Sequence, residues 1–187
     1  MSRNSIYQDL DERFLARWSP RAFLAEPISE EHILTIFEAA RWSPSCFNAQ
    51  PWRFVYATDG EQKTALLDAL VESNRAWASQ APVIAYAFSY NIFDHNNKPN
   101  RWAEFDTGAA WMALTLQAIH LGYHTHAMGG FDADKAHEAC DMDPASHTAL
   151  CGIVIGKIGP ADMLDESARE REQPSDREVM EKIAWKR

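Results

Sequence analysis

The sequence has few glycines and no long apolar run, and each shortage excludes a class of protein. Only 8 of the 187 residues are glycine. No G-x-G-x-x-G or Walker loop is present, so a Rossmann dinucleotide site and a P-loop have no support. No G-x-S-x-G elbow offers a hydrolase nucleophile. No stretch approaches the roughly 18 uninterrupted apolar residues that indicate a membrane span, so we expect no membrane partner.

Cysteine is also scarce. Cys46, Cys140 and Cys151 are odd in number and lack C-x-x-C spacing. The first residues do not form the apolar segment of a secretory signal. These features predict free thiols and a cytoplasmic protein. Cys46 has no identifiable base beside it, which favours an inert thiol over a nucleophile.

Basic residues are outnumbered, with 18 Lys plus Arg against 27 Asp plus Glu and a formal charge of −9. Such a charge disfavours nucleic acid and anionic membranes as partners. A local anion site is still possible, because six arginines fall within the first 53 residues, namely Arg3, Arg13, Arg17, Arg21, Arg41 and Arg53.

Histidines offer no convincing metal site. His120 and His124 are spaced by one helical turn, but Gly122 between them is expected to end the helix. No cysteine or carboxylate stands nearby at ligand spacing to complete a tetrahedral set. We therefore predict no metal.

Helical and extended patterns alternate, which predicts an α+β domain spanning residues 1–187. Helices are expected over 5–16, from 30 (capped by Ser29) to Pro44, over 62–71 and 106–121, and over 133–140 (capped by Asp132). Strands are expected over 53–58, 82–88, 125–128 and 150–158. The helix 106–121 is apolar all round and should be central and buried. Residues 90–100 read as a polar loop, and the charged stretch beyond Pro160 as an arm onto a partner subunit or a loosely packed tail.

Two polar segments could carry chemistry. Arg17-Trp18-Ser19-Pro20-Arg21 places two guanidiniums and a hydroxyl on a loop that proline restricts, and these donors suit phosphate. Pro44-Ser45-Cys46-Phe47-Asn48-Ala49-Gln50-Pro51-Trp52 holds a hydroxyl and two carboxamides, which can pair with the mixed edge of a heteroaromatic ring. Taken singly, the first segment also fits a solvated surface loop. The second also fits a helix-to-strand connection whose amides satisfy their own backbone.

Together the two segments, R-x-S-x-R and P-S-x-x-N-x-Q-P-W, resemble the N-terminal signature of FMN-dependent nitroreductases. Later landmarks follow in the same order over residues 10–180: Asp106 to Ala110, Leu121-Gly122, Gly129 to Asp132, Ile155-Gly156 and Pro174 to Arg177. The resemblance implies a nitroreductase-like α+β fold, with a mixed central β-sheet flanked by helices. It also implies a homodimer with two FMN sites at its interface and a C-terminal arm that crosses to the partner.

The implied activity is that of an FMN-dependent NAD(P)H oxidoreductase. It would act by ping-pong hydride transfer to an acceptor such as a nitroaromatic, a quinone or an activated alkene. Because this chemistry takes place on the flavin N5 atom, we assign no protein residue as a general acid or base. The alternative is a non-catalytic flavin-binding or interaction protein that kept the fold.

The resemblance also implies which residues bind FMN. Arg17, Ser19 and Arg21 would hold its phosphate and ribityl side, with Arg177 completing the phosphate site. The amide at Met128-Gly129 would face flavin N5. The full expected set is Arg17, Trp18, Ser19, Arg21, Pro44, Ser45, Cys46, Asn48, Gln50, Met128, Gly129 and Arg177, of which the residues from 44 to 48 would contact the flavin held mainly by the other subunit.

Two tryptophans depart from the family pattern. Trp18 stands where many members have a basic residue or histidine, and Trp77 where some carry a lysine near the ring. With fewer cations near the flavin, more of the charge neutralisation would fall to Arg21.

Overall fold

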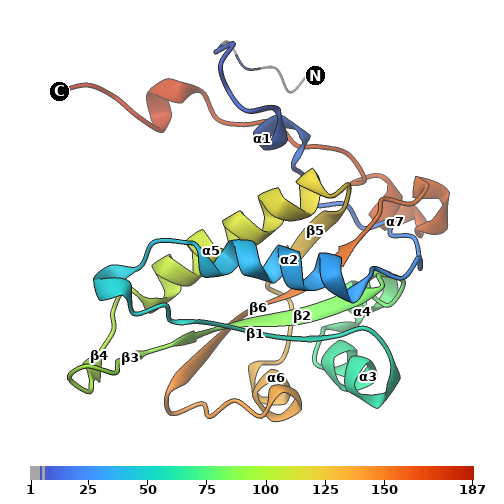
Figure 1. The fold of residues 1–187 in the computed structure, drawn as a ribbon. Helices are drawn as coiled ribbons and strands as arrows, with labels where there is room; N and C mark the ends of the chain where they lie inside the picture. The colour runs from blue at the N-terminus through green and yellow to red at the C-terminus, as the bar shows by residue number, and fades with distance from the viewer. Residues whose placement is uncertain (1–4, 6) are drawn as a thin grey trace.

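The centre of the fold is a four-stranded sheet (Figure 1). The computed structural model describes residue 5 and residues 7–187. The strand order is β1 (Trp52–Ala57), β2 (Val83–Tyr90), β6 (His147–Gly156) and β5 (His124–Met128). All three neighbouring pairs in this described sheet are antiparallel. The α+β class is thus confirmed, but the sheet is antiparallel where we expected a mixed one. Strand direction is set by how each connection returns to the sheet, which periodicity does not record.

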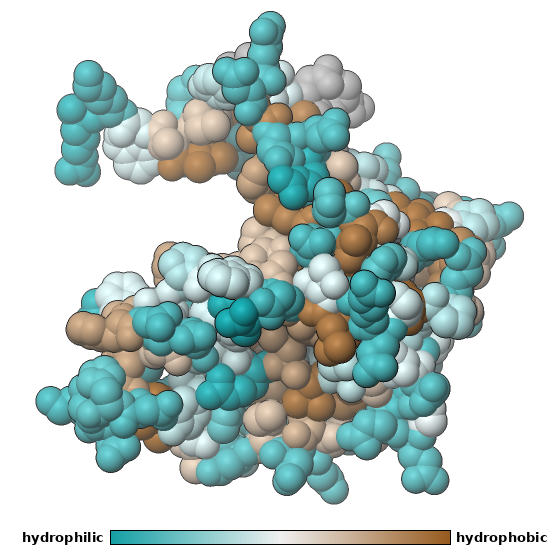
Figure 2. All heavy atoms as spheres, viewed as in Figure 1, coloured by the Kyte–Doolittle hydropathy of each residue, from teal (hydrophilic) through white to brown (hydrophobic). Residues whose placement is uncertain are grey.

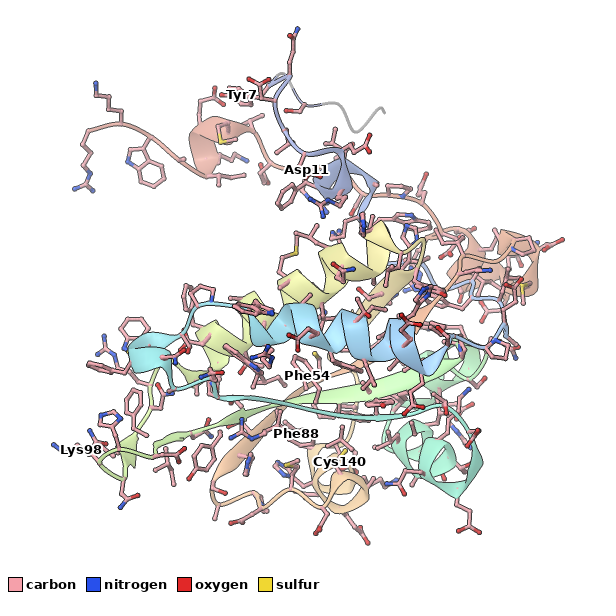
Figure 3. The ribbon with its side chains drawn as sticks, viewed as in Figure 1. Tyr7, Asp11, Phe54, Phe88, Lys98 and Cys140 are labelled. Atoms are coloured by element: carbon pink, nitrogen blue, oxygen red, sulfur yellow. The ribbon has the colours of Figure 1, made fainter. Side chains whose placement is uncertain are left out.

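Successive side chains of β2 point to opposite faces of the sheet, and this divides the core into two layers. On β2, Val83 and Ala85 face one side, whereas Ile84 and Tyr86 face the other. The first side packs on α2 (Glu30–Arg41) and α5 (Ala103–His120), and the second on α3 (Gly60–Asp68), α4 (Glu72–Ala78) and α6 (Ala133–Cys140). Figure 3 shows Phe54 on the α2 side and Phe88 with Cys140 on the α6 side. Both faces of the sheet are therefore covered.

Helix ends follow the capping residues. Ser29 Oγ accepts the N–H of His32 at the start of α2, and Asp132 accepts the N–H of Lys135 at the start of α6, as the sequence predicts. α5 ends at His120, and Gly122 takes a φ of 81°, a conformation that glycine adopts without cost. The helix therefore stops before His124, which lies in β5.

Several predicted boundaries were wrong. The first helix, α1, covers only Glu12–Ala16, with Asp11 as its cap, and residue 6 of the predicted range lies outside the described residues. The helix predicted over 62–71 is α3, which begins and ends earlier, and α4 was not predicted. The polar loop contains a short hairpin, β3 (Ile92–Phe93) paired with β4 (Lys98–Pro99). α5 is buried on one side only, because Phe105 is 75% exposed.

The last part of the chain has little regular structure. After β6 come η2 (Ala161–Met163) and α7 (Glu166–Arg169), which pack on the body through Leu164 and Ala168. The C-terminal arm, residues 173–187, then leaves the body and carries η3 (Met180–Lys182) (Figure 1). Among the described residues, no helix combines the length and apolarity needed to cross a membrane.

Candidate functional site

The arginine loop, residues 17–21, lies over β5. His126 on β5 donates from its ring Nδ1 to the carbonyl oxygen of Pro20 at 2.8 Å. Within the loop, Arg17 Nη1 donates to Ser19 Oγ at 3.4 Å. The loop therefore places Arg17 and Ser19, two predicted phosphate ligands, side by side, on a backbone that the hydrogen bond from His126 holds in place.

His126 supports the loop as a neutral side chain. Burial is the main cause that lowers its pKa to about 4, and Arg21 and Arg17 add to this effect, while its bond to Pro20 opposes it. The pKa of His124 is also lowered, first by burial. Near neutral pH both imidazoles are uncharged. The positive charge at this place therefore comes from the two arginines. The sequence favoured a strand histidine with local hydrogen bonds at His126 over a metal ligand, but it did not indicate that the partner is Pro20 of the arginine loop.

Arg21 is held by the segment that precedes the C-terminal arm. Its backbone N–H and that of Ala22 donate to the carboxylate of Glu172, at 2.9 Å each. Its guanidinium Nη1 donates to the carbonyl oxygen of Arg171 at 3.4 Å. Partial burial, followed by the charge of Arg171, lowers the pKa of Arg21, and Glu172 opposes the shift. No local pattern in the sequence points to Glu172, which lies 151 positions from Arg21.

β5 leads from the arginine loop to the turn at Met128-Gly129. This turn begins two residues after His126, about 7 Å along an extended strand. A Cβ at Gly129 would meet nothing within 4 Å, so the main chain there is open. At Gly130 a Cβ would lie 2.7 Å from Asn74 Nδ2, which instead donates to the Gly130 carbonyl oxygen at 3.0 Å. The arginine loop and the open backbone at Gly129 are thus both positioned by β5: the loop is bonded to His126 in this strand, and Gly129 directly follows its last residue, Met128.

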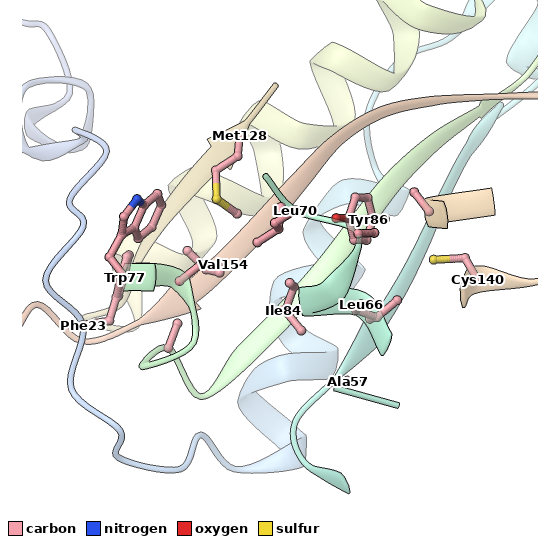
Figure 4. Packing of buried hydrophobic residues seen from close by; sticks show 14 of the residues in the cluster. Phe23, Ala57, Leu66, Leu70, Trp77, Ile84, Tyr86, Met128, Cys140 and Val154 are labelled. Carbon is pink, nitrogen blue, oxygen red and sulfur yellow. The ribbon is translucent and has the colours of Figure 1, made fainter. Parts of the chain in front are cut away.

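Trp77 belongs to the core beneath this site. It is 6% exposed, and its ring lies 4.6 Å from that of His126 and 6.5 Å from that of Phe23. Figure 4 shows Trp77 beside Phe23, with Met128 nearby. Trp77 therefore supports the loop by packing, and Trp18 within the loop is half-buried.

The amide turn, residues 44–50, is a second polar structure with an unusual backbone. Phe47, Asn48 and Gln50 have φ values of 52°, 54° and 47°. Such left-handed residues cost energy and cluster at functional sites. The turn is held by the buried Asp106, whose Oδ2 accepts the N–H of Cys46 at 3.0 Å, and by Ser45, whose Oγ accepts the N–H of Gln50 at 3.0 Å.

The arginine loop and the amide turn lie toward opposite ends of α2 (Figure 1). This 12-residue helix is about 18 Å long at 1.5 Å per residue. One chain therefore does not bring together the two halves of the predicted site. Arg177 lies in the C-terminal arm, where its Nη1 donates to the carbonyl oxygens of its neighbours Ser175 and Asp176.

The cysteines and acidic residues offer no competing centre. All three cysteines are free. Burial raises the pKa of Cys140 to about 12 and that of Cys151 to about 11, so both thiols stay protonated. Within residues 5 and 7–187, no group of three or more His, Cys, Asp or Glu side chains could hold a metal ion.

Comparison with known proteins decides the family. A model of the Nitroreductase family matches residues 15–77 and 70–157. The chain belongs to the nitroreductase family. The match contains the arginine loop, the amide turn and Met128-Gly129, whereas Arg177 lies outside it.

Related proteins agree with this assignment. A solved structure of an oxidoreductase containing FMN is 41% identical, with a TM-score of 0.91, and the match covers 97% of this nitroreductase-family chain and 93% of that chain. A "Putative NADH dehydrogenase/NAD(P)H nitroreductase" of Xanthomonas oryzae pv. oryzae (strain PXO99A) is 30% identical over 148 residues, which cover 70% of this chain and 76% of that protein. An uncharacterized 15.4 kDa protein of Mycolicibacterium smegmatis is 31% identical over 86 residues, covering 46% of this chain and 57% of that protein.

Proposed function

We propose that this member of the nitroreductase family is an FMN-dependent NAD(P)H oxidoreductase that works as a homodimer, with the chain forming one FMN-binding domain. The observation that carries the proposal is the contact between the Arg17 guanidinium and the Ser19 hydroxyl, on a loop that His126 holds against the strand leading to the open main chain at Gly129. The FMN in the 41% identical oxidoreductase supports it. The proposal also places the protein in the cytoplasm, because all three cysteines are free.

The donors of the arginine loop fit the FMN phosphate. Arg17, Ser19 and Arg21 offer charged and neutral N–H and O–H groups, and arginine forks match the geometry of phosphate oxygens. Neutral His126 fixes the loop without adding charge. We therefore assign phosphate binding to the side chains of Arg17, Ser19 and Arg21.

The chain's own residues bind and orient rather than transfer protons. When bound, FMN supplies the hydride chemistry at its N5 atom, between NAD(P)H and an acceptor such as a nitroaromatic, a quinone or an activated alkene. The open backbone at Gly129 would allow a ring to approach the Met128-Gly129 amide closely. The cationic loop would stabilise negative charge that develops nearby.

A homodimer explains why half of the predicted site lies far from the other half. Asn48 and Gln50 of the amide turn would reach the flavin held by the partner chain. Apolar side chains around the amide turn are exposed, with Phe47 80% and Phe105 75% accessible. The C-terminal arm projects away from the body, with open space beneath it (Figure 2), and it exposes Val179, Met180, Ile183 and Trp185. Exposed apolar surface of this kind is typical of an interface.

The first experiment is purification followed by reduction under argon. We expect a yellow protein whose flavin absorbance is bleached by NADH or NADPH and restored by an electron acceptor. A steady-state screen of acceptors with both nicotinamides would then identify the preferred pair. Yellow protein that neither nicotinamide bleaches would support the non-catalytic flavin-binding alternative. Colourless protein that also fails to take up FMN would refute both.

A second experiment tests whether the site is shared between two chains. Arg17→Ala and Asn48→Ala chains, each impaired alone, are mixed under conditions that exchange subunits. A shared site predicts recovery of roughly one quarter of wild-type activity, because half of the dimers are hybrids and each hybrid has one intact site. No recovery despite proven exchange would place Arg17 and Asn48 in the same-chain site.

A further inference from the structure

Glu172, which directly precedes the C-terminal arm, connects this part of the chain to the arginine loop. Its Oε1 accepts the N–H groups of Arg21 and Ala22, and its Oε2 also accepts that of Arg21, all at 2.9 Å. A carboxylate that accepts backbone N–H groups forms charge-assisted hydrogen bonds, which are stronger than neutral ones. Two consecutive peptide groups are thereby fixed at the point where the loop enters the core.

The segment that carries Glu172 is itself well anchored. Arg169 donates to three main-chain carbonyl oxygens, those of Ala161, Asp162 and Leu164, at 3.3, 3.2 and 2.9 Å. Leu164 and Ala168 are buried in the core layer that also contains Trp77. The carboxylate of Glu172 is therefore presented from a folded turn and not from the free arm.

The N–H groups of Arg21 and Ala22 that donate to Glu172 do not form an exposed anion site. Ala22 is 1% exposed, so its N–H points into the protein and not toward solvent. On the other side of the loop, His126 holds the carbonyl oxygen of Pro20. The peptide groups that follow Ser19 are thus fixed from two directions, by Glu172 and by His126.

We infer that Glu172 is a positioning residue, which holds the arginine loop in the shape that binds the phosphate of the cofactor. This inference rests on the proposed function, since it requires FMN to bind at Arg17, Ser19 and Arg21. Glu172 acts through the backbone of Arg21 and Ala22 and touches no phosphate oxygen itself. Its removal should harm phosphate binding specifically and leave contacts to the flavin ring intact.

The test compares FMN with riboflavin, which lacks the phosphate. Glu172→Gln keeps one oxygen acceptor but loses the charge, and Glu172→Ala loses both. We expect Glu172→Ala to weaken FMN binding by about tenfold or more, and Glu172→Gln to have a smaller effect in the same direction. Riboflavin affinity should fall much less than FMN affinity in both variants, because riboflavin lacks only the phosphate. Glu170→Gln, a neighbouring exposed glutamate, is the matched control and should behave as wild type.

The outcomes separate this role from a general loss of stability. Equal weakening of FMN and riboflavin binding would show that Glu172 matters only for the fold, and tighter FMN binding would show that its carboxylate competes with phosphate. Either result overturns the inference. Hydrogen exchange on flavin-free protein gives an independent check, because the amides of Arg21 and Ala22 should exchange faster in Glu172→Ala. If wild-type protein binds no FMN, the proposed function and the phosphate-positioning role both fail. The exchange rates would then show only whether Glu172 holds the loop.

Discussion

Acid should destabilise the protein through His126, which is partly buried under the arginine loop. Burial holds the pKa of this imidazole at about 4, compared with 6.5 for an unperturbed histidine. The unfolded chain therefore binds a proton at a higher pH than the folded chain does. The stability that neutral His126 contributes is present above pH 6.5 and is lost as the pH falls from 6.5 toward 4.

The expected size follows from these two pKa values. One pKa unit corresponds to about 1.4 kcal/mol, so the full effect is about 3 kcal/mol, of which about 2.5 kcal/mol is lost between pH 7 and pH 4.5. Arg17 and Arg21 contribute to the effect, because a third cation beside these two arginines is unfavourable.

Urea unfolding of flavin-free protein at a series of pH values measures this loss. His126→Asn is the comparison variant, since asparagine can still donate to the Pro20 carbonyl oxygen but does not titrate in this range. Subtracting its pH profile from that of wild type removes the carboxylates and His124, which titrate in both proteins. A difference that stays flat between pH 7 and pH 4.5 would refute the assignment of a partly buried, neutral His126.

Three further predictions test other parts of the structure. Arg17→Ala should weaken FMN binding by about 1.5–3 kcal/mol, the range for hydrogen bonds to charged groups, and calorimetric titration that finds unchanged affinity would remove Arg17 from the phosphate site. Tyr86→Phe should leave the free energy of unfolding unchanged or raise it by about 1 kcal/mol, because the Tyr86 hydroxyl is buried without a hydrogen-bond partner among the described residues; a loss above about 1 kcal/mol in urea unfolding would contradict this. Gly130→Ala should lower stability by about 1–3 kcal/mol, since its Cβ would meet Asn74 at 2.7 Å. Gly129→Ala, where a Cβ has free space, should change thermal stability little, and equal destabilisation by both substitutions would show that the clash is not the cause.

Local signals in the sequence predicted much of the chain correctly. The side chains of Ser29 and Asp132 cap the helices that they were expected to begin, and Gly122 separates α5 from β5. These features depend on one or two residues and their immediate neighbours, so a single sequence records them. Errors fell where the pattern was weak, as at α4, or short, as in the β3–β4 hairpin.

Contacts between distant residues could not be predicted in this way. The bonds from Glu172 to Arg21 and Ala22 span about 150 positions, and the bond from His126 to Pro20 spans 106. Neither partner carries a local pattern that points to the other. The direction of the strands is of the same kind, because it depends on where a connection returns and not on the period of the strand itself.

The sequence by itself determined the family, through the order and spacing of the arginine loop and the amide turn. These motifs survive in the sequence because each is a short continuous stretch with a defined set of hydrogen-bonding groups. Only the tertiary structure decided that the two stretches lie at opposite ends of α2, and that His126 and Glu172 fix the loop from two sides. Burial and long-range hydrogen bonding determine those arrangements, and they arise only once the chain has folded.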